Sequence, residues 1–599
     1  MANNRLEHTS QLSRHSHDTS AAYALSLAPG MILPVYFDVL NPNDTVYLKS
    51  HLFARLKDTL TAFRGEIDMH IDSFFVPLQM IYTAFGQIYC QTDDFLSSFY
   101  SDSFSKDSFP LIAMSNIDNI TRNAIGTYSD FECNGKALLR LLSAFDLNPY
   151  QVQRMTTTLA GDTSPKTNLN QNPNISPWIP CAYQAIYQNY YRNDEFERRD
   201  VRSYNIDFAS AASTFWENRM FRLRHHQRPS DYFTSVRVSP ITSAVNMMKQ
   251  QPNLFHDLND GILGVKNWLQ PEIENTEFQD YANATGAGTL EDFTSTGIFM
   301  SQDSNAHGSS YLNTSNIRSL FAIEKFSRIY GCADKTYDAQ ILAHMGIKIP
   351  HDVKHDLSHV SHYRMVMTSD PIYGTSNNID ANNNVVSSIG QVGGQCLVEG
   401  DTKEDKFTAP VHGVFMVCIY ALTKPRYAHT FSKLNLLTNR LSFPIPEYDK
   451  LGAQPLFHFE FNNYALRSPG ALTFIAGWQN RYQQFKKKYN RIAPVFEAYN
   501  SFGSSTNIYA PWFVSRPFAF ETGEQDFEQP SENMVVPTVG LFESPKGLNS
   551  VMIQRFSPSW DKSFTTHLHE ALQTDPIVVD YTAFAKKVSW MSETGEPDL

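Results

Sequence analysis

Alternating apolar and polar residues near the start of the chain predict short β-strands. Residues 31–40 and 45–56 are two predicted strands, and the turn-forming sequence Asn-Pro-Asn-Asp separates them at 41–44. In residues 65–77 the alternation is regular, which predicts a strand with one buried and one solvated face. The expected buried face is Ile67, Met69, Ile71 and Ser73, and the expected solvated face is Glu66, Asp68, His70 and Asp72.

Two segments in the C-terminal third have different patterns. Residues 414–422 are almost continuously apolar and rich in β-branched and aromatic side chains, which predicts a buried strand that ends at Lys424 and Pro425. Farther on, four aromatic residues recur at the spacing of one helical face, which predicts a helix. This stripe, which is more typical of core packing than of a base-stacking platform, consists of Trp478, Tyr482, Phe485 and Tyr489.

Helical periodicity also appears in the connections between the predicted strands. The helical segment at 181–199 would present an aromatic face made by Tyr183, Tyr187 and either Tyr190 or Tyr191. The helical segment at 334–346 would end at Gly346. Helices spaced this irregularly do not build βαβ units. We therefore expect a mainly β fold of the jelly-roll type, with long insertions that contain helices and loops. The helical segments are 79–89, 136–145, 181–199, 317–331 and 334–346.

Changes in composition divide the chain into four regions. Residues 1–30 are polar and lack periodicity, so we expect an extended N-terminal arm that becomes ordered on a partner surface. Residues 31–241 would hold jelly-roll strands and a long helical and loop insertion. Residues 242–315 are rich in Gly, Ser, Thr and Asn, which predicts a surface insertion loop. Residues 316–599 would contain a helical pair, the remaining strands and a C-terminal segment.

Composition makes the surface of this protein unusual. Of its 599 residues 42% are hydrophobic and only 18% are charged, below the usual quarter or so. Much of its polarity therefore comes from uncharged side chains, which suits surfaces that pack against copies of themselves. The net charge of −12 argues against a surface that binds nucleic acid throughout, but it leaves room for one basic face.

Cysteine spacing and hydropathy indicate the cellular environment in which the chain folds. The six cysteines form no CxxC pair, so neither a zinc ribbon nor a disulfide framework is predicted, and we expect a reducing environment. The first twenty residues lack the apolar core of a secretory signal. The longest apolar run is far shorter than the roughly 20 residues that cross a bilayer, so we expect a soluble chain.

One histidine-rich segment resembles a metal site. On a helix His351, His355 and His359 would share a face, as zinc ligands do, and His362 follows closely. The glutamate of an HExxH motif is absent. We favour a solvated segment or subunit contact whose histidines titrate near neutral pH, and keep the metal site as the weaker alternative. The chain has no P-loop, GxSxG or Rossmann glycine motif, so we expect neither a cofactor nor an enzymatic activity.

Basic residues accompany the aromatic stripe of the predicted helix. They form either an ordinary charged helix face or a surface that contacts phosphates, with aromatic rings available for base stacking. Their pattern alone does not decide between these. The residues are Arg481, Lys486, Lys487, Lys488 and Arg491.

Many segments in the same order resemble the major capsid protein of the Microviridae, the small icosahedral single-stranded DNA phages, and most closely its gokushovirus-like branch. The closing stretch of this resemblance includes LGAQPL, with Ala453 where the family motif has Glu, and GWQNRY at 477–482. Each match is short, but together they span nearly the whole chain. The other matching segments are 8–20, 30–46, 70–87, 190–196, 228–236, 317–352, 369–394, 412–430 and 575–599.

The resemblance implies a mainly β fold, an eight-stranded antiparallel viral jelly roll with long helix- and loop-containing insertions, and a structural, non-enzymatic role. Sixty copies would close a T=1 shell around circular single-stranded DNA, and the virion would be assembled in the bacterial cytoplasm. Further implied partners are a small basic DNA-binding protein, an internal scaffolding protein, a DNA pilot protein and a host cell-surface receptor. The basic residues at 481–491 would face the DNA. The 242–315 insertion would form the threefold protrusion and contact the host, with candidate residues Asn283, Thr285, Asp303, Asn305, His307 and Tyr311.

Two alternatives remain open on the sequence. One is a jelly-roll carbohydrate-binding protein that acts alone. The other is a metal-dependent enzyme of the cupin type that uses the histidines at 351–362.

Overall fold

A computed structural model describes about two fifths of the chain. The described residues are 14–27, 30–56, 66–89, 135–147, 175–192, 199–208, 220–226, 231–233, 235, 325–326, 329, 337–348, 356–373, 378–379, 385–387, 392–424, 426–427, 430–438, 440–449, 453–457, 460, 475–493 and 577–591.

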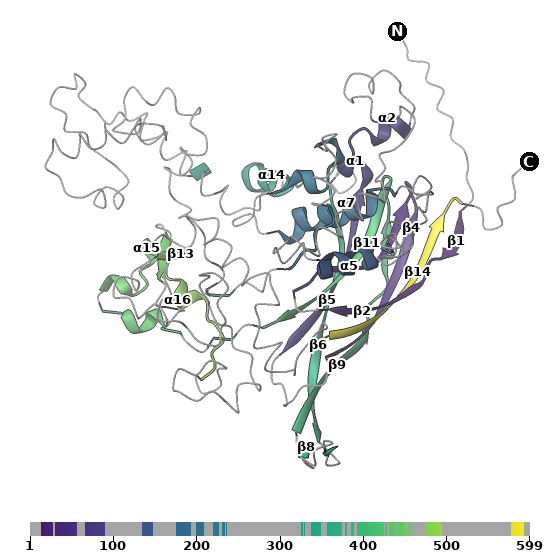
Figure 1. Ribbon diagram of the computed structural model, residues 1–599. Coiled ribbons are helices and arrows are strands. Elements are labelled where there is room, and N and C mark those ends of the chain that lie inside the picture. Colours follow the sequence, from purple (N-terminus) through teal and green to yellow (C-terminus); the bar gives the residue numbers. More distant parts are fainter. Residues whose placement is uncertain are drawn as a thin grey trace, which may run out of the picture.

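The described part is mainly β, and a large curled antiparallel sheet dominates it (Figure 1). Its strands lie in the order β1-β14-β4-β9-β6-β5-β11-β3, with β2 also paired to β14 and β10 to β4. The strands of this sheet are β1 (His15–Asp18), β2 (Ala21–Leu27), β3 (Leu33–Leu40), β4 (Thr45–Leu56), β5 (Ile67–Pro77), β6 (Ser358–Tyr373), β9 (Val392–Asp401), β10 (Asp405–Thr408), β11 (Gly413–Thr423) and β14 (Ile577–Ser589). Two small ladders pair β7 (Asn378–Ile379) with β8 (Val385–Ser387) and β12 (Ala453–Phe457) with β13 (Ile475–Asn480).

The long strand β6 joins two parts of the sheet. Its first half pairs with β5 from Ser358 to Met367, and its second half pairs with β9 from Thr368 to Tyr373. One part is therefore β3-β11-β5-β6, and the other is β6-β9-β4-β14 with β1, β2 and β10. The strands β3, β4 and β5 alternate between the parts, because β3 and β5 lie in the first and β4 lies in the second.

Helices cover the first part of the sheet. Helices α1 and α7 contact β5 and β11, and α5 contacts β3. Figure 1 shows these helices grouped beside the sheet. The helices are α1 (Leu78–Ile81), α2 (Phe85–Tyr89), α5 (Gly135–Ala144), α7 (Trp178–Ile186), α14 (Tyr337–Met345), α15 (Pro446–Asp449) and α16 (Gln483–Lys486), with a π-helical turn η2 (Tyr187–Tyr191) and the 3₁₀ turns η3 (Val201–Ser203), η4 (Ile206–Phe208), η7 (Lys433–Leu436) and η8 (Arg440–Ser442).

Local patterns located most of these elements correctly. Strand β4 has the predicted bounds, β3 and β11 lie within a few residues of theirs, and the turn at 41–44 is closed by a bond from Asp44 N to Asn41 O (3.0 Å). Asn43 takes the left-handed conformation that such turns need. Of the predicted helices, α5 is confirmed, and α14 is followed by Gly346, whose φ of 71° suits a helix C-terminus.

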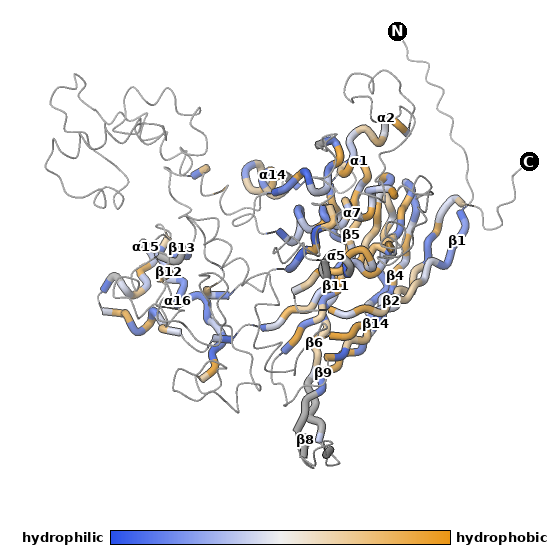
Figure 2. Tube along the Cα trace, viewed as in Figure 1, coloured by the Kyte–Doolittle hydropathy of each residue, from blue (hydrophilic) through white to orange (hydrophobic). Residues whose placement is uncertain are grey.

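The prediction of a half-buried strand at 65–77 was wrong. Every residue of β5 is buried, because α1 and α7 contact the strand, the ring of Tyr191 packs on Phe74, and the ring of Phe407 from β10 packs on Phe75. Figure 2 shows the apolar residues concentrated along the central strands. A solvated strand face and a face covered by a helix from a distant insertion both tolerate polar residues, so alternation alone did not separate them.

The N-terminal segment also requires a correction. Residues 15–27 form β1 and β2, and both strands pair with β14 of the same chain. These residues are extended as predicted, but they become ordered on the C-terminal strand of their own chain. The first thirteen residues lie outside the described part.

Gly413 begins β11 where there is no room for a side chain. A Cβ atom would lie 2.2 Å from Cζ of Phe75 and 2.7 Å from the carbonyl oxygen of Val76. Changing Gly413 to Ala should lower the free energy of unfolding by about 2 kcal/mol, in the range for overpacked cores. Denaturant titration of the full chain measures this. Gly400→Ala is the matched control, because only the flexible side chain of Met365 lies near that site (3.3 Å); equal losses would contradict the prediction.

Candidate functional site

Positive charge is concentrated in one segment that follows β11. Residues 424–493, here called the basic lobe, contain eleven Lys and Arg but only three Asp and Glu, an excess of eight positive charges in a chain whose net charge is −12. The described elements of the basic lobe are η7, η8, α15, β12, β13 and α16, which lie together in Figure 1. Such an asymmetry is the electrostatic signature of a surface that meets an anionic partner.

Aromatic residues form the centre of the basic lobe. The ring of Tyr489 lies 4.6 Å from that of Phe233, and the ring of Tyr427 lies 5.0 Å from Phe233. The hydroxyl of Tyr427 donates to the carboxylate of Asp231. Residues 231–233 therefore belong to the same packed unit as the basic lobe, although almost two hundred residues separate them in sequence.

A buried carboxylate lies beneath the basic surface. Glu460 is fully buried and accepts hydrogen bonds from the Tyr232 hydroxyl (3.0 Å) and the Phe457 amide (3.1 Å). Burial raises the pKa of Glu460, although the ammonium of Lys433, 3.5 Å away, acts in the opposite direction. Lys433 also donates to the Pro455 carbonyl (2.6 Å), which holds η7 against β12.

The prediction of one helix across 478–489 was wrong. Trp478 lies in β13, where it pairs with Pro455 of β12, and Tyr482 takes a left-handed conformation with φ of 60°. Helix α16 then lasts a single turn, and Lys487 is extended again. The aromatic spacing was helical by coincidence, because pairing with β12 decides the conformation of this segment. Tyr482 is buried, as core packing requires, whereas Phe485 is 39% exposed.

The structure brings the five predicted DNA-facing residues into the basic lobe, around α16. Arg481 lies over the ring of Tyr482 at 5.3 Å, Lys486 forms an ion pair with Asp449, and Lys488 donates to the Gln484 carbonyl (3.2 Å). Lys487 is half-buried, and Arg491 is exposed at a short bridge with Tyr427.

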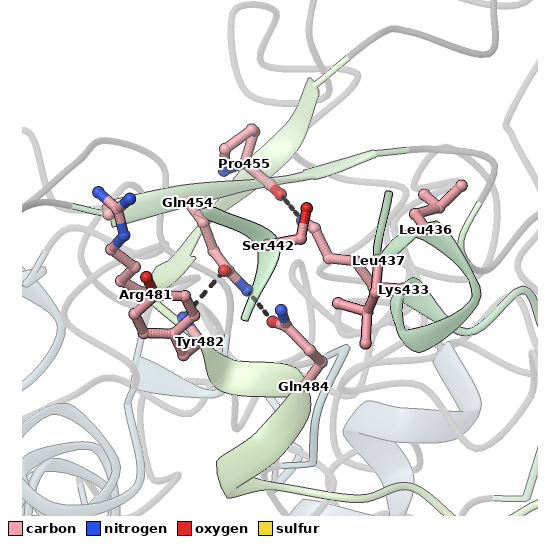
Figure 3. A pocket seen from close by; sticks show the side chains of 10 residues that line it. Lys433, Leu436, Leu437, Ser442, Gln454, Pro455, Arg481, Tyr482 and Gln484 are labelled. Atoms are coloured by element: carbon pink, nitrogen blue, oxygen red, sulfur yellow. Dashed lines mark hydrogen bonds between the residues drawn. The ribbon is translucent and has the colours of Figure 1, made fainter. Parts of the chain in front are cut away.

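A pocket of about 330 Å³ opens between η7, η8, β12 and the β13–α16 turn (Figure 3). Its polar wall consists of Lys433, Ser442, Gln454, Arg481 and Gln484, and its apolar wall consists of Leu436, Leu437, Ala453, Pro455 and the Tyr482 ring. Sequence reasoning found Arg481 but missed the other polar residues of the pocket. Gln454 lies within the LGAQPL segment, but nothing in a single sequence indicates that β12 would lie beside residue 481.

Hydrogen bonds fix the two glutamine amides of this pocket. Gln454 accepts from the Tyr482 backbone amide through Oε1 (2.9 Å) and donates through Nε2 to Gln484 Oε1 (2.8 Å). Figure 3 shows this chain of bonds crossing the pocket wall. Because the carbonyl of Gln484 is occupied, its amide N–H groups remain as donors on the pocket side.

A second polar cluster surrounds Asp72, on the face of β5 that was expected to meet solvent. Its side chain is fully buried and accepts from Tyr191 (2.6 Å) and from His362 Nδ1 (2.5 Å), while His359 Nε2 lies 3.6 Å away. Burial acts to raise the pKa of Asp72, but hydrogen bonds from His359, Tyr191 and His362 outweigh it and lower the pKa below its usual value.

Two histidines of the candidate metal segment lie in a strand. Strand β6 contains both His359 and His362, so the helical face on which histidines could share a metal ion does not form at these residues. His351 and His355 lie outside the described residues. Among the side chains that the structure describes, no group of three or more His, Cys, Asp or Glu has a metal-binding arrangement. The host-contact candidates from Asn283 to Tyr311 also lie outside the described part.

Histidine and tyrosine rings extend this cluster. The ring of Tyr420 stacks on His70 at 4.8 Å and on His226 at 4.5 Å, and Tyr190 stacks on His359 at 4.7 Å. Burial lowers the pKa of His70 to about 4, and the neighbouring His362 and His226 add to the shift. His70 is therefore neutral at pH 7, and its Nδ1 is buried without a hydrogen-bond partner.

His70 should make the fold sensitive to acid. The unfolded chain takes up a proton at this residue near pH 6.5, whereas the folded chain resists protonation down to about pH 4. The stability contribution is therefore complete above pH 6.5 and is lost as the pH falls to 4, about 2–3 kcal/mol in total. Urea titrations across this range should show a shallower loss for His70→Asn. His17→Asn, at a partly exposed position at the edge of the sheet, should keep the wild-type slope; identical slopes for all three proteins would contradict this assignment.

Comparison of the sequence with known protein families and curated proteins finds no match. Among the described residues, no helix is long and apolar enough to cross a membrane.

Proposed function

We propose that this chain is the major capsid protein of a small single-stranded DNA phage of the Microviridae type, close to the gokushovirus-like branch. In this proposal sixty copies close a T=1 shell around a circular genome in the bacterial cytoplasm. The observation that carries the proposal is the strand order β3-β11-β5-β6, with β3, β4 and β5 alternating between two parts of one curled sheet. That arrangement is compatible with an eight-stranded jelly roll, in which a late strand returns between early ones.

The placement of the long connections supports the same role. Among the described strands of the large sheet, β5 ends at Pro77 and β6 begins at Ser358, and β11 ends at Thr423 and β14 begins at Ile577. A framework of strands that tolerates insertions of this size leaves large surfaces for contacts between subunits and with a host. The low content of charged residues suits such contacts, because charged side chains are depleted in the centres of interfaces.

The basic lobe supports the proposal that the shell encloses an anionic polymer. The lobe has an excess of eight positive charges, whereas the rest of the chain is negatively charged, so this region is the one suited to phosphates. Aromatic residues are interleaved with the cations, as they are in proteins that hold single strands. The proposal assigns this region to the genome and assigns the 242–315 insertion to the host receptor. The small basic DNA-binding protein, the internal scaffolding protein and the DNA pilot protein are the other proposed partners.

The mass of the purified protein in solution tests this function. A shell of sixty chains of 68.1 kDa has a mass of about 4 MDa. Light scattering after size-exclusion chromatography should find that species, alone or after addition of single-stranded DNA. A stable 68.1 kDa monomer that binds glycans and never assembles would instead establish the carbohydrate-binding alternative.

A further inference from the structure

Two carboxyl groups and one amine meet inside the large sheet, away from the basic lobe and from the network around Asp72. The amine belongs to Lys587 of β14, whose side chain is 7% exposed. One carboxyl group belongs to Asp44, which lies in the turn between β3 and β4 and is 1% exposed, and the other belongs to Asp38 of β3, which is 22% exposed. The proposed function makes no use of this cluster.

The Lys587 amine is held against the carboxyl group of Asp38. Its Nζ lies 3.3 Å from Oδ1 and 3.2 Å from Oδ2, so it is in van der Waals contact with the carbon Cγ between them. Nζ also donates to the Val39 carbonyl (2.7 Å), which fixes the position of the amine beside β3. A nucleophile and an electrophile held at such a distance have the rate advantage of an intramolecular reaction.

Asp44 places a second carboxyl group beside the same amine. Its Oδ2 lies 3.9 Å from Lys587 Nζ and accepts from the Asn41 amide (2.9 Å), whereas its Oδ1 is buried without a hydrogen-bond partner. Two carboxylates and one ammonium leave a net negative charge in the interior, which costs free energy. A buried and incompletely paired carboxylate next to an amine is suited to act as its general base.

The surroundings of Asp38 favour the neutral form of its carboxyl group. Burial raises the pKa of Asp38, the charge of Lys587 opposes this, and the charge of Asp44 adds to it. The neutral form is the one that an amine attacks, because the negative charge of a carboxylate repels the nitrogen lone pair. The partial exposure of Asp38 gives a released water molecule a way out.

We propose that Lys587 and Asp38 form a covalent amide bond that joins β14 to β3. One ammonium proton passes to an oxygen of Asp38, which leaves a neutral amine beside a neutral carboxyl group. The nitrogen lone pair then bonds to Cγ, while Asp44 accepts the second nitrogen proton and returns it to the departing hydroxyl. The Cγ–O bond breaks and water leaves, so the step consumes no oxidant, reductant or other reactant.

This bond would replace two buried charges by an uncharged amide. It would also close a loop of 549 residues between two strands of the sheet. Cross-links that close long loops restrict the unfolded chain most, so the bond would hold the two parts of the sheet together.

The mass of the denatured full chain tests this bond. Loss of one water should make the protein about 18 Da lighter than its sequence requires, and peptide mapping should recover one branched peptide that joins residues 38 and 587. Lys587→Arg keeps the positive charge but should abolish both signals, because a guanidinium is not deprotonated in proteins. Lys586→Arg, the same change at the exposed neighbour in β14, should retain both.

Asp44→Asn tests the proton acceptor. The variant keeps an oxygen for the Asn41 amide but accepts no proton, so the loss of water should appear at least about a hundredfold more slowly in chains sampled at intervals after synthesis. An unchanged rate would overturn the role of Asp44. A wild-type mass that stays equal to that of the sequence during prolonged incubation of the folded chain would overturn the bond, as would a loss that persists in Lys587→Arg. The wild-type measurement decides the matter even if a variant fails to fold.

Discussion

Replacing Asp72 by Asn is expected to lower the free energy of unfolding by about 3 kcal/mol or more. Breaking a buried charged network leaves its partners unsatisfied, which costs several kcal/mol. The Asp72 side chain is fully buried and accepts from Tyr191 and His362 at once. Tyr191 is itself completely buried and has no other acceptor for this hydroxyl among the described contacts. An amide at position 72 places N–H groups where donors already converge.

Asp401 provides the matched control for this change. It also accepts from two basic side chains, Lys49 (2.8 Å) and His51 (2.7 Å), but its side chain is 48% exposed. Exposed ion pairs contribute little, so Asp401→Asn should cost less than about 1 kcal/mol. Urea titration of the full chains at pH 7 measures both. Equal losses, or a loss below about 1 kcal/mol for Asp72→Asn, would contradict the role given to the buried network.

Neutralising the cations around α16 is expected to reduce DNA binding and leave shell formation intact. The variant changes Lys486, Lys487, Lys488 and Arg491 to Gln. Each cation that contacts a phosphate releases counterions, which contributes about 0.7 to the slope of log K against log salt for single strands. The slope should therefore fall by up to about 3. Titrating a labelled oligonucleotide at several salt concentrations measures it, and the nucleic-acid content of purified particles gives the packaging result.

A second set of four cations controls for net charge. Lys49, Arg55, Lys406 and Lys586 lie on β4, β10 and β14, outside the basic lobe, and also comprise three Lys and one Arg. Their replacement by Gln changes the total charge equally but should leave the salt slope and packaging unchanged. A loss of DNA that is the same in both variants would show that total charge, rather than the basic lobe, governs binding.

The sequence predicts those elements whose conformation depends on nearby residues. Strand β4, with its preceding Asn-Pro-Asn-Asp turn, and strand β11, with its continuous apolar run, were placed closely. Helix α5 followed from its own amphipathic pattern. In each case the period and the stop signals lie within the segment itself.

The failures share a different cause, which is that distant segments decide the outcome. The aromatic residues at 478–489 had helical spacing, but pairing of β13 with β12 makes the first part a strand. The polar face of β5 was expected to meet solvent, but Tyr191 from the insertion covers Asp72. In the candidate site, too, local sequence predicted some features and distant contacts decided others. The basic residues were visible as a cluster, whereas the pocket depends on Lys433, Gln454 and Arg481 meeting across three separate elements.

The central claim is that this chain closes a shell, and imaging the purified protein by electron microscopy tests it most directly. We expect uniform closed particles about 25–30 nm across, the size for sixty compact subunits of this length. Averaged images should show icosahedral symmetry. Fields that contain only monomers or small open oligomers, with and without single-stranded DNA, would contradict it.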